Sequence, residues 1–391
     1  MSTKKDADLK AARAIVRTPF GSWANQRNIS IYFLQEPDKT EVLGYFKGIS
    51  EEQEHVAKYG LSGGGILKDA TGVQGLVINT LNFLKALGLI PSYQILPNLY
   101  DTGGRRADIA IGVSDFIASG DDTLGATIYK QAPESDSLGR SLILYNSNLP
   151  MATERIQKHS VLHEIMHASG FRHPFDSKTR VALTALGDAK YDSLKYTALA
   201  YNAHPNFTKQ DLPTSLMLLD YLALDDMGLL DEATVNAGDT IYHWGGSEKV
   251  LHTIYDAGGV DTLSAEGHSR NTIVDLRDGH FSSYGAASKG KEVPIENLAI
   301  AYGRTVENAL GGDKDDVLIG NDVSNKLEGG KGNDFLYGNG ADYKTDAWQF
   351  SQAHKDAYTA TIDASTVKAD DDDEIHGGEG YDYISGGSGK D

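Results

Sequence analysis

The chain has 391 residues, with 36 basic and 55 acidic side chains and no cysteine. This length indicates two or three domains of about 150 residues each, and an apolar content of 40% excludes a disordered chain. The lack of cysteine excludes a disulfide scaffold, a thiolate metal site and a cysteine nucleophile. The net charge of −19 argues against a nucleic-acid partner, because phosphate groups would be repelled.

The charge is distributed unevenly along the chain. Residues 1–200 carry 22 basic and 21 acidic side chains, a net charge of +1, whereas residues 201–391 carry 14 and 34, a net charge of −20. An acidic block is often a solvated tail, but this one also contains strand-like apolar residues and many of the 43 glycines. No apolar run is long enough to span a membrane, and the N-terminus lacks the apolar stretch of a cleavable signal peptide.

Strand and helix patterns alternate over the first 230 residues. Branched and aromatic residues predict strands at 29–35, 107–117, 124–131 and 141–148. Helical spacing of apolar residues predicts helices at 7–16, 72–90, 154–169 and 215–227. This mixture indicates an α+β domain. On the last helix, Asp220, Asp225 and Asp226 are expected to form a solvated face.

A nine-residue period begins at residue 311 and returns after an interruption at 343–367. The sixth position of each complete unit is acidic or Asn: Asp316, Asn325, Asp334, Asp373 and Asp382. The eighth position is apolar: Leu318, Leu327, Leu336, Ile375 and Ile384. One unit cannot bury its apolar side chain alone, so the units are expected to stack with the eighth residues pointing inward.

The segment HEIMHASGFRHP, residues 163–174, contains the strongest chemical signal. On a helix, His163 and His167 lie one turn apart, so both imidazoles project from one face and can bind one Zn²⁺. Gly170 is expected to let the chain leave the helix through a left-handed conformation, and the turn to return His173 as a third ligand. Three neutral histidines leave one position for water, as a catalytic zinc site requires, and Glu164 lies beside that position as a general base.

Two plainer interpretations of the histidines stay open. The side chains could be surface histidines that hold no metal, or ligands of a structural zinc in a protein without turnover. Among the other candidates, His243, His252, His268 and His280 have no ligand spacing. The sequence contains no phosphate-binding P-loop and no Gly-x-Ser-x-Gly nucleophile elbow.

These motifs resemble the metzincin clan of zinc endopeptidases, and Pro174 after the third histidine resembles the serralysin family in particular. YTALAYN (196–202) is similar to the Met-turn segment of that family, and SLMLLDYLALDDMG (215–228) to the helix that closes its catalytic domain. The resemblance implies that Tyr201 is a switchable zinc ligand that steadies the transition state. The Met-turn methionine is replaced by Leu199, a volume-conserving change of a residue that is not a zinc ligand.

The resemblance implies a fold and a domain order. An α+β metzincin catalytic domain, with a twisted mixed sheet and helices, is followed by an all-β parallel β-roll domain. The expected division is an N-terminal extension at 1–30, which is a candidate prosegment, the catalytic domain at 31–235, and the roll at 236–391 with an insertion at 343–367.

The acidic units are similar to the calcium-binding RTX repeat G-G-x-G-x-D-x-U-x. Their glycines permit tight turns with exposed carbonyls, and the sixth residue supplies a carboxylate for Ca²⁺, which takes six to eight oxygen ligands. The expected ligands in the repeats are Gly311, Gly312, Asp313, Asp316, Gly329, Gly330, Gly332, Asp334, Asp373 and Asp382. By resemblance, earlier ligands fall at Asn236, Gly238, Thr240, Asp256, Gly258, Asp261, Thr305 and Glu307. Without Ca²⁺ the carboxylates repel one another, so this region is expected to be largely unfolded.

The hypothesis is a secreted endopeptidase that uses one catalytic Zn²⁺ and several structural Ca²⁺ ions. Zinc-activated water attacks the peptide bond of a protein substrate with Glu164 as general base, and the substrate lies along the strand edge at 124–131 by β-addition. One alternative is a non-catalytic, calcium-dependent binding or adhesion protein on a degenerate metzincin scaffold. Another is an inactive precursor whose N-terminal segment covers the zinc.

The resemblance also implies the environment of the protein. The expected partners are protein or peptide substrates, a type I secretion apparatus and a protein inhibitor, with no nucleic acid and no transmembrane segment. The chain is expected to be a monomer that is exported without a cleavable N-terminal signal peptide and folds outside the cell.

Overall fold

A computed structural model describes a large part of the chain, and the fold below concerns that part. The described residues are 4–16, 29–35, 67–68, 70–90, 92–99, 102, 107–114, 125–130, 140–149, 152–174, 189–230, 235–286, 296–338 and 372–386. The chain forms two compact units. The sheet unit consists of residues 14–178 and 227–231, and the roll unit of residues 1–13, 179–226 and 232–391.

Residues 179–226 group with the roll unit rather than with the sheet unit. The predicted domain limits at residues 30 and 235 follow sequence motifs, and they stay predictions. Within the described residues, no helix is both long and apolar enough to cross a membrane.

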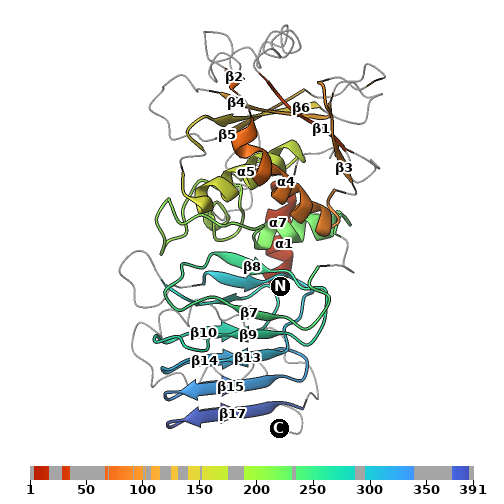
Figure 1. Cartoon of the computed structure of the whole chain (residues 1–391). Helices are drawn as coiled ribbons and strands as arrows, with labels where there is room; N and C mark the ends of the chain where they lie inside the picture. The colour runs from red at the N-terminus through yellow and green to blue at the C-terminus, as the bar shows by residue number, and fades with distance from the viewer. Residues whose placement is uncertain are drawn as a thin grey trace. The chain divides into compact units, whose positions relative to one another are not determined.

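The sheet unit contains a mixed sheet and two long helices (Figure 1). Its strands are β1 (Ile29–Phe33), β2 (Leu67–Lys68), β3 (Tyr93–Ile95), β4 (Ile109–Ser114), β5 (Gly125–Lys130) and β6 (Arg140–Asn146). The order is β3-β1-β4-β6-β5, and β2 pairs with β4 beside this path. β1, β3, β4 and β6 run parallel, whereas β2 and β5 are antiparallel to their neighbours. The sequence therefore predicted an α+β arrangement correctly, together with four of these strands.

The central strands are buried on both faces. Ile109, Ala110 and Ile111 of β4 are at most 1% exposed, as are Leu142, Ile143 and Leu144 of β6. Such continuous burial is typical of the inner strands of a parallel arrangement. A consecutive apolar run, rather than an alternating one, is what the sequence offers here.

The helices of the sheet unit are α4 (Thr71–Ala86) and α5 (Glu154–Ala168). α5 lies against β5 and β6, and α4 lies against α5. On α4, Val73, Val77, Leu81 and Leu84 are at most 1% exposed, which confirms the predicted apolar face. The chain leaves this helix through Gly88, whose φ of 81° is in the left-handed region.

The roll unit stacks short strands in successive layers (Figure 1). One parallel sheet has the order β7-β9-β13-β15-β17, and a second has the order β10-β14-β16-β18. The strands of the first are β7 (Ile241–His243), β9 (Thr262–Ser264), β13 (Asn308–Leu310), β15 (Lys326–Lys331) and β17 (Glu374–Glu379). Those of the second are β10 (Ile273–Asp275), β14 (Val317–Ile319), β16 (Phe335–Tyr337) and β18 (Tyr383–Ser385). From β13 onward the chain alternates between the two sheets, as expected for a β-roll.

A third sheet departs from the expected all-parallel roll. β8 (His252–Ile254) and β12 (Leu298–Ile300) are parallel, but β11 (Phe281–Ser282) is antiparallel to β12. An antiparallel pair such as β11 and β12 does not need the crossover connection that a parallel pair requires.

The apolar side chains of the repeats form the core of the roll. Leu318, Leu327 and Leu336 are fully buried, and Ile375 packs against them. The predicted inward orientation of the eighth position is confirmed for these four units. It is wrong for Ile384, which is 48% exposed in β18, at the end of the second sheet. The side chains of the preceding layers are each covered by the next turn, and β18 has no further described strand beyond it.

The predicted insertion at 343–367 lies among residues that the structure does not describe. Its effect on the roll is nevertheless visible in the strand register. Ala309 pairs with Leu327, 18 positions later, whereas Leu327 pairs with Ile375, 48 positions later. The sequence between β16 and β17 is therefore 30 residues longer than one turn of the roll requires. The next turn pairs in the same register.

The roll unit also contains α1 (Lys4–Ala14, apart from its last residue), the 3-10 helix η4 (Ala189–Tyr191) and α7 (Leu218–Asp226). α7 corrects the expectation of a solvated acidic face. Asp226 is exposed, but Asp220 has no exposed surface. Its Oδ2 accepts hydrogen bonds from the main-chain N–H groups of Ala198 and Met217, and its Oδ1 accepts one from the Thr197 hydroxyl. The buried carboxylate of Asp220 therefore holds the segment at 196–200 in place through these hydrogen bonds.

Candidate functional site

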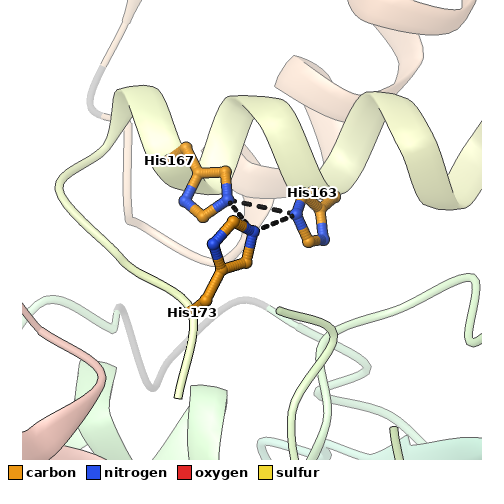
Figure 2. A group of neighbouring side chains, drawn as sticks. All are labelled: His163, His167 and His173. Carbon is orange, nitrogen blue, oxygen red and sulfur yellow. Dashed lines mark hydrogen bonds between the residues drawn. The ribbon is translucent and has the colours of Figure 1, made fainter. Parts of the chain in front are cut away.

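Three histidine side chains converge beside α5 (Figure 2). The Nε2 atoms of His163 and His167 are 3.0 Å apart, because residues at i and i+4 share a helix face. The Nε2 atom of His173 lies 3.1 Å from that of His163 and 2.9 Å from that of His167. The predicted triad is thus brought together by the fold, in the described part of the sheet unit.

The end of α5 explains how His173 returns to the helix. Gly170 has a φ of 97°, which confirms the predicted left-handed exit. The Gly170 N–H donates to the carbonyl of His167, and the Phe171 N–H donates to that of Met166. This pair of bonds is a Schellman motif, which closes a helix and reverses the chain.

The segment at residues 15–16 stabilises the turn after α5. Val16 forms a bridge with Phe171, and the N–H of Arg172 donates to the carbonyl of Ile15. Phe171 has no exposed surface. These contacts fix the backbone that precedes His173, so the position of the third imidazole does not depend on its own side chain alone.

The protonation of the triad fits a bound cation. The Nδ1 atom of His167 lies 2.9 Å from the carbonyl oxygen of Phe171, and since a carbonyl can only accept, Nδ1 carries the hydrogen. The neutral ring then presents a bare Nε2 lone pair to the other two rings. Burial, together with the charge of His163, lowers the pKa of His173 to about 3. Converging lone pairs repel unless a cation lies between them, and imidazole nitrogens are suitable ligands for Zn²⁺.

Glu164 follows His163 on α5 and is buried. Its side chain is 6% exposed, and burial raises the pKa of its carboxyl group to about 7, while the hydrogen bond from Thr127 lowers it. The Thr127 hydroxyl donates to Glu164 Oε2 at 2.7 Å. Thr127 belongs to β5, so α5 and the antiparallel strand β5 meet at this carboxylate. A carboxyl group with a pKa near neutrality can both accept and return a proton.

Leu199 and Tyr201 belong to the roll unit. Leu199 is completely buried, and its N–H donates to the hydroxyl of Thr197, which Asp220 holds in turn. Tyr201 is 61% exposed. Its role as a zinc ligand stays a prediction, as does the place of Leu199 beneath the metal.

The predicted calcium ligands of the early roll form one acidic cluster. The N–H of Thr240 donates to Asp261 Oδ1, the N–H of Asp261 donates to Glu307 Oε2, and the N–H of Gly258 donates to Asp256 Oδ1. Burial, and the charges of Asp256 and Glu307, raise the pKa of Asp261 to about 6.

The predicted main-chain ligands lie around this cluster. Asn236 has a φ of 54°, a conformation that Asn tolerates better than most residues, and its amide donates to the Tyr242 hydroxyl. The Tyr242 hydroxyl in turn donates to Asp256. The carbonyl of Gly238 accepts from the Thr240 hydroxyl. Thr305 is half-buried, two residues before Glu307.

The sixth-position side chains of the repeats form two stacks. In one, the N–H of Asp316 donates to Asp334 Oδ1, and the N–H of Asp334 donates to Asp382 Oδ1. In the other, the N–H of Asn325 donates to Asp373 Oδ1. Burial raises the pKa of Asp316 to about 8 and that of Asp334 to about 7, and neighbouring carboxylates add to both shifts.

The glycines of the repeats bring the turns close together. Gly330 has a φ of 99°, and a Cβ atom there would lie 2.4 Å from the Gly312 carbonyl oxygen. The neighbouring predicted ligands Gly311, Gly329 and Gly332 also lie against main-chain atoms of an adjacent turn. The N–H of Gly312 donates to Asp316 Oδ2. Asp313 is paired with Lys331 on the surface, which leaves it a weaker candidate ligand than the buried carboxylates.

Two buried oxygen atoms mark where cations fit the roll. Within the part of the chain that the structure describes, Oδ2 of Asp261 and Oδ2 of Asp334 have no hydrogen-bond donor. A buried carboxylate oxygen without a donor is costly. A hard cation with oxygen ligands would satisfy both atoms, and Ca²⁺ has that preference.

The sequence did not single out Thr127 or Asp220 as partners of the site segments. Thr127 lies 37 positions before Glu164, and the hydrogen bond depends on how β5 is placed against α5. Asp220 could have been recognised by its position among Leu218, Leu219 and Leu222, since a carboxylate on the apolar face of a helix requires buried donors.

Comparisons with known proteins support the resemblance to the serralysin family. Residues 236–379 match the family model described as peptidase M10 serralysin C terminal. A serralysin of Photorhabdus luminescens is 33% identical over 252 residues, which cover 58% of this chain and 49% of the relative. Metalloprotease AprA of Pseudomonas entomophila is 30% identical over 215 residues, 49% of this chain and 43% of the relative. A serralysin of Proteus mirabilis is 27% identical over 260 residues, 61% of this chain and 45% of the relative. The chain spans about half the length of the curated relatives it matches.

Proposed function

We propose that this chain, whose resemblance to serralysin-type metalloproteases is confirmed by its relatives, is a zinc-dependent endopeptidase. The observation that carries the proposal is the meeting of the His163, His167 and His173 Nε2 atoms within 2.9–3.1 Å of one another, beside the buried carboxylate of Glu164. The three histidines would hold Zn²⁺. Once bound, the ion supplies a Lewis acid and lowers the pKa of a water molecule to about 7.

We assign Glu164, which follows His163 on α5, as the general base. It would accept a proton from the attacking water and return it to the leaving amine. Its burial supports this role, because a carboxyl group with a pKa near 7 is balanced between the two forms. We assign Tyr201 as a further zinc ligand whose hydroxyl donates a hydrogen bond to the developing oxyanion; this assignment rests on its place in the segment that is similar to the Met-turn.

The substrate in this proposal is an extended peptide laid along β5. Among the described strands, β5 pairs with β6 alone and ends the path of the sheet. A free strand edge can bind a peptide through main-chain hydrogen bonds. β5 also carries Thr127, which touches Glu164, so a peptide on this edge would pass close to the base.

The proposal includes structural Ca²⁺ ions in the roll and a site of action outside the cell. The stacked carboxylates of Asp316, Asp334 and Asp382 support a cation requirement, and free Ca²⁺ is abundant outside cells. A monomer exported by a type I secretion apparatus, with a protein inhibitor as a further partner, completes the proposal by resemblance.

The replacement of the Met-turn methionine by Leu199 favours one second candidate, a calcium-dependent binding protein that retains zinc without turnover. A digest of a peptide library separates the two functions. A zinc-loaded protein that cleaves no peptide would support the binding protein, whereas cleavage at any peptide bond would support the endopeptidase.

The direct test of the base uses Glu164→Ala beside the wild-type protein, with casein as substrate and equal zinc content measured in both. Loss of hydrolysis by a factor of about 100 or more is expected, because general base catalysis contributes about 10²–10⁴-fold. Glu154→Ala is the matched control, since Glu154 is an exposed glutamate on the same helix. Equal hydrolysis by the wild type and Glu164→Ala would refute the mechanism.

A further inference from the structure

β5 touches Glu164 at two points. The Thr127 Oγ1 atom lies 2.7 Å from Oε2 of the Glu164 carboxylate and 3.0 Å from the main-chain oxygen of the same residue. Two positions earlier, on the same face of the strand, Gly125 lies so close that an added Cβ would be 2.7 Å from Glu164 Cγ and 2.9 Å from Oε1. One face of β5 therefore lies against both carboxylate oxygens of Glu164.

The Thr127 hydroxyl can donate to only one of its two acceptors at a time, because it has one hydrogen. An ionised carboxylate is the stronger acceptor, and charge-assisted bonds are the shorter ones, in agreement with 2.7 Å against 3.0 Å. The hydroxyl thus fixes Oε2. Oε1 lies on the side of Gly125, where the strand has no side chain to block it.

We propose that Thr127 is a positioning residue for Glu164, and that Gly125 provides the space which this position requires. The inference rests on the proposed function, in which Glu164 is the base. It adds a link between binding and chemistry: the strand that would pair with the substrate also orients the carboxylate. A peptide seated on β5 is then registered against Glu164 by one rigid element rather than by two independent ones.

The geometry also gives Thr127 a function after proton transfer. A protonated Glu164 carries an O–H group that can donate to a lone pair of Thr127 Oγ1. The threonine hydrogen can then turn to the Glu164 main-chain oxygen, which is already within reach at 3.0 Å. The carboxyl group therefore keeps the same partner before and after it accepts the proton.

Three variants test the inference in the full chain, loaded with zinc and calcium. Thr127→Val keeps the shape and removes the hydroxyl, Thr127→Ser restores the hydroxyl, and Thr80→Val removes a comparable threonine hydrogen bond, to the Leu76 carbonyl, elsewhere in the sheet unit. For Thr127→Val we expect kcat for a peptide substrate to fall roughly ten- to hundredfold, the loss expected for one hydrogen bond to a charged group. KM and zinc content should stay within about twofold, and Thr127→Ser should recover most of the lost kcat.

Gly125→Ala gives an independent measurement, because its methyl group would displace Glu164 while the Thr127 hydroxyl stays in place. A fall of kcat at unchanged zinc content is expected here as well. A kcat of Thr127→Val equal to that of the wild type and of Thr80→Val would overturn the positioning role. An equal fall in Thr127→Ser would also overturn it, since the hydroxyl would then not be the group that matters.

A readout without turnover separates this inference from the proposed function. Urea-unfolding free energies of Thr127→Val, Glu164→Ala and the double variant form a thermodynamic cycle, in which Ala removes the acceptor that Gln would keep. Non-additive shifts are expected if the two side chains are bonded, and additive shifts would overturn the inference. Full activity of Glu164→Gln would instead defeat the proposed function, whereas an inactive Glu164→Gln beside a fully active Thr127→Val would defeat the positioning role alone.

Discussion

Asp220 shows how one residue can link segments that are distant in the chain. Its carboxylate has no exposed surface and holds Thr197, Ala198 and Met217 by hydrogen bonds. Burial raises the pKa of this carboxyl group to about 6, and the three hydrogen bonds oppose part of the rise. The folded state therefore binds a proton more tightly than the unfolded state, in which the pKa is about 3.9.

This shift predicts a pH dependence of stability. Because the pKa is raised on folding, Asp220 lowers the free energy of unfolding as the pH rises from about 4 to about 6, by on the order of 3 kcal/mol, with no further change above that range. Asp220→Asn should remove this contribution, since Asn can keep accepting from the two N–H groups while the Thr197 hydroxyl turns to accept from its amide. Urea unfolding at pH 4 and pH 6.5 checks the difference between the variant and the wild type. Identical pH slopes in the two proteins would contradict the prediction.

At the same scale, the histidine triad could be predicted because its geometry is local. The i and i+4 spacing of His163 and His167 depends only on the helix, and Gly170 marks the exit that returns His173. Thr127 and Asp220 could not be assigned in the same way. Thr127 lies 37 positions from Glu164, and Asp220 lies 23 and 22 positions from Thr197 and Ala198. Only the packed fold brings these residues together.

At the scale of elements, α1 is held in the roll unit by a buried carboxylate. Asp8 is 1% exposed and accepts hydrogen bonds from Lys4, Tyr191 and Tyr302. Arg13 at the other end of the helix forms two hydrogen bonds with Asp226. These contacts support α1 as a permanent part of the roll unit, which bears on the expectation that residues 1–30 are a removable segment.

Removing the Asp8 carboxylate should destabilise the protein. Asp8→Ala leaves the hydroxyls of the buried Tyr191 and Tyr302 without this acceptor, and we expect the free energy of unfolding to fall by about 2–3 kcal/mol. Lys10→Ala, at an exposed position on the same helix, should change it by less than about 0.5 kcal/mol. Thermal and urea unfolding measure both. An unchanged stability in Asp8→Ala, or gain of activity on truncation before residue 14, would favour the removable prosegment instead.

The repeats illustrate which elements the sequence predicts well. A nine-residue period with an inward eighth residue predicts two alternating strands per 18 residues, and the pairing of Ala309 with Leu327 has this spacing. The antiparallel β11 and the exposure of Ile384 were not predicted. β11 lies in a segment without the period, and the exposure of Ile384 depends on which layers cover it rather than on its own unit.

At the scale of the whole molecule, the charge asymmetry has a physical explanation. The half with a net charge of −20 contains the stacked side chains of Asp316, Asp334 and Asp382. Burial and the neighbouring carboxylates raise the pKa values of Asp316 and Asp334. Bound Ca²⁺ would neutralise these groups and supply the partner that the buried oxygen of Asp334 requires.

Removal of calcium should therefore unfold the roll. After depletion of divalent cations on a chelating resin and readdition of zinc alone, we expect loss of strand circular dichroism and a larger hydrodynamic radius. Ca²⁺ should reverse both changes, and Mg²⁺ at the same concentration should not, because it demands a smaller octahedral site. Asp334→Asn should raise the Ca²⁺ concentration required, by about tenfold or more if one charged ligand is lost, whereas Asp322→Asn at an exposed position should not. A roll that stays folded without Ca²⁺ would contradict this explanation.

The most direct measurement of the central claim is a zinc titration of the metal-stripped, calcium-loaded protein with an unfolded protein as substrate. Hydrolysis should rise in proportion to added Zn²⁺ and stop rising at one equivalent. Glu164→Ala should bind the same single equivalent without hydrolysis, and His163→Ala should lose both binding and hydrolysis. Peptide-bond hydrolysis that is independent of Zn²⁺, or its absence at one bound equivalent in the wild-type protein, would contradict a zinc endopeptidase at His163, His167 and His173.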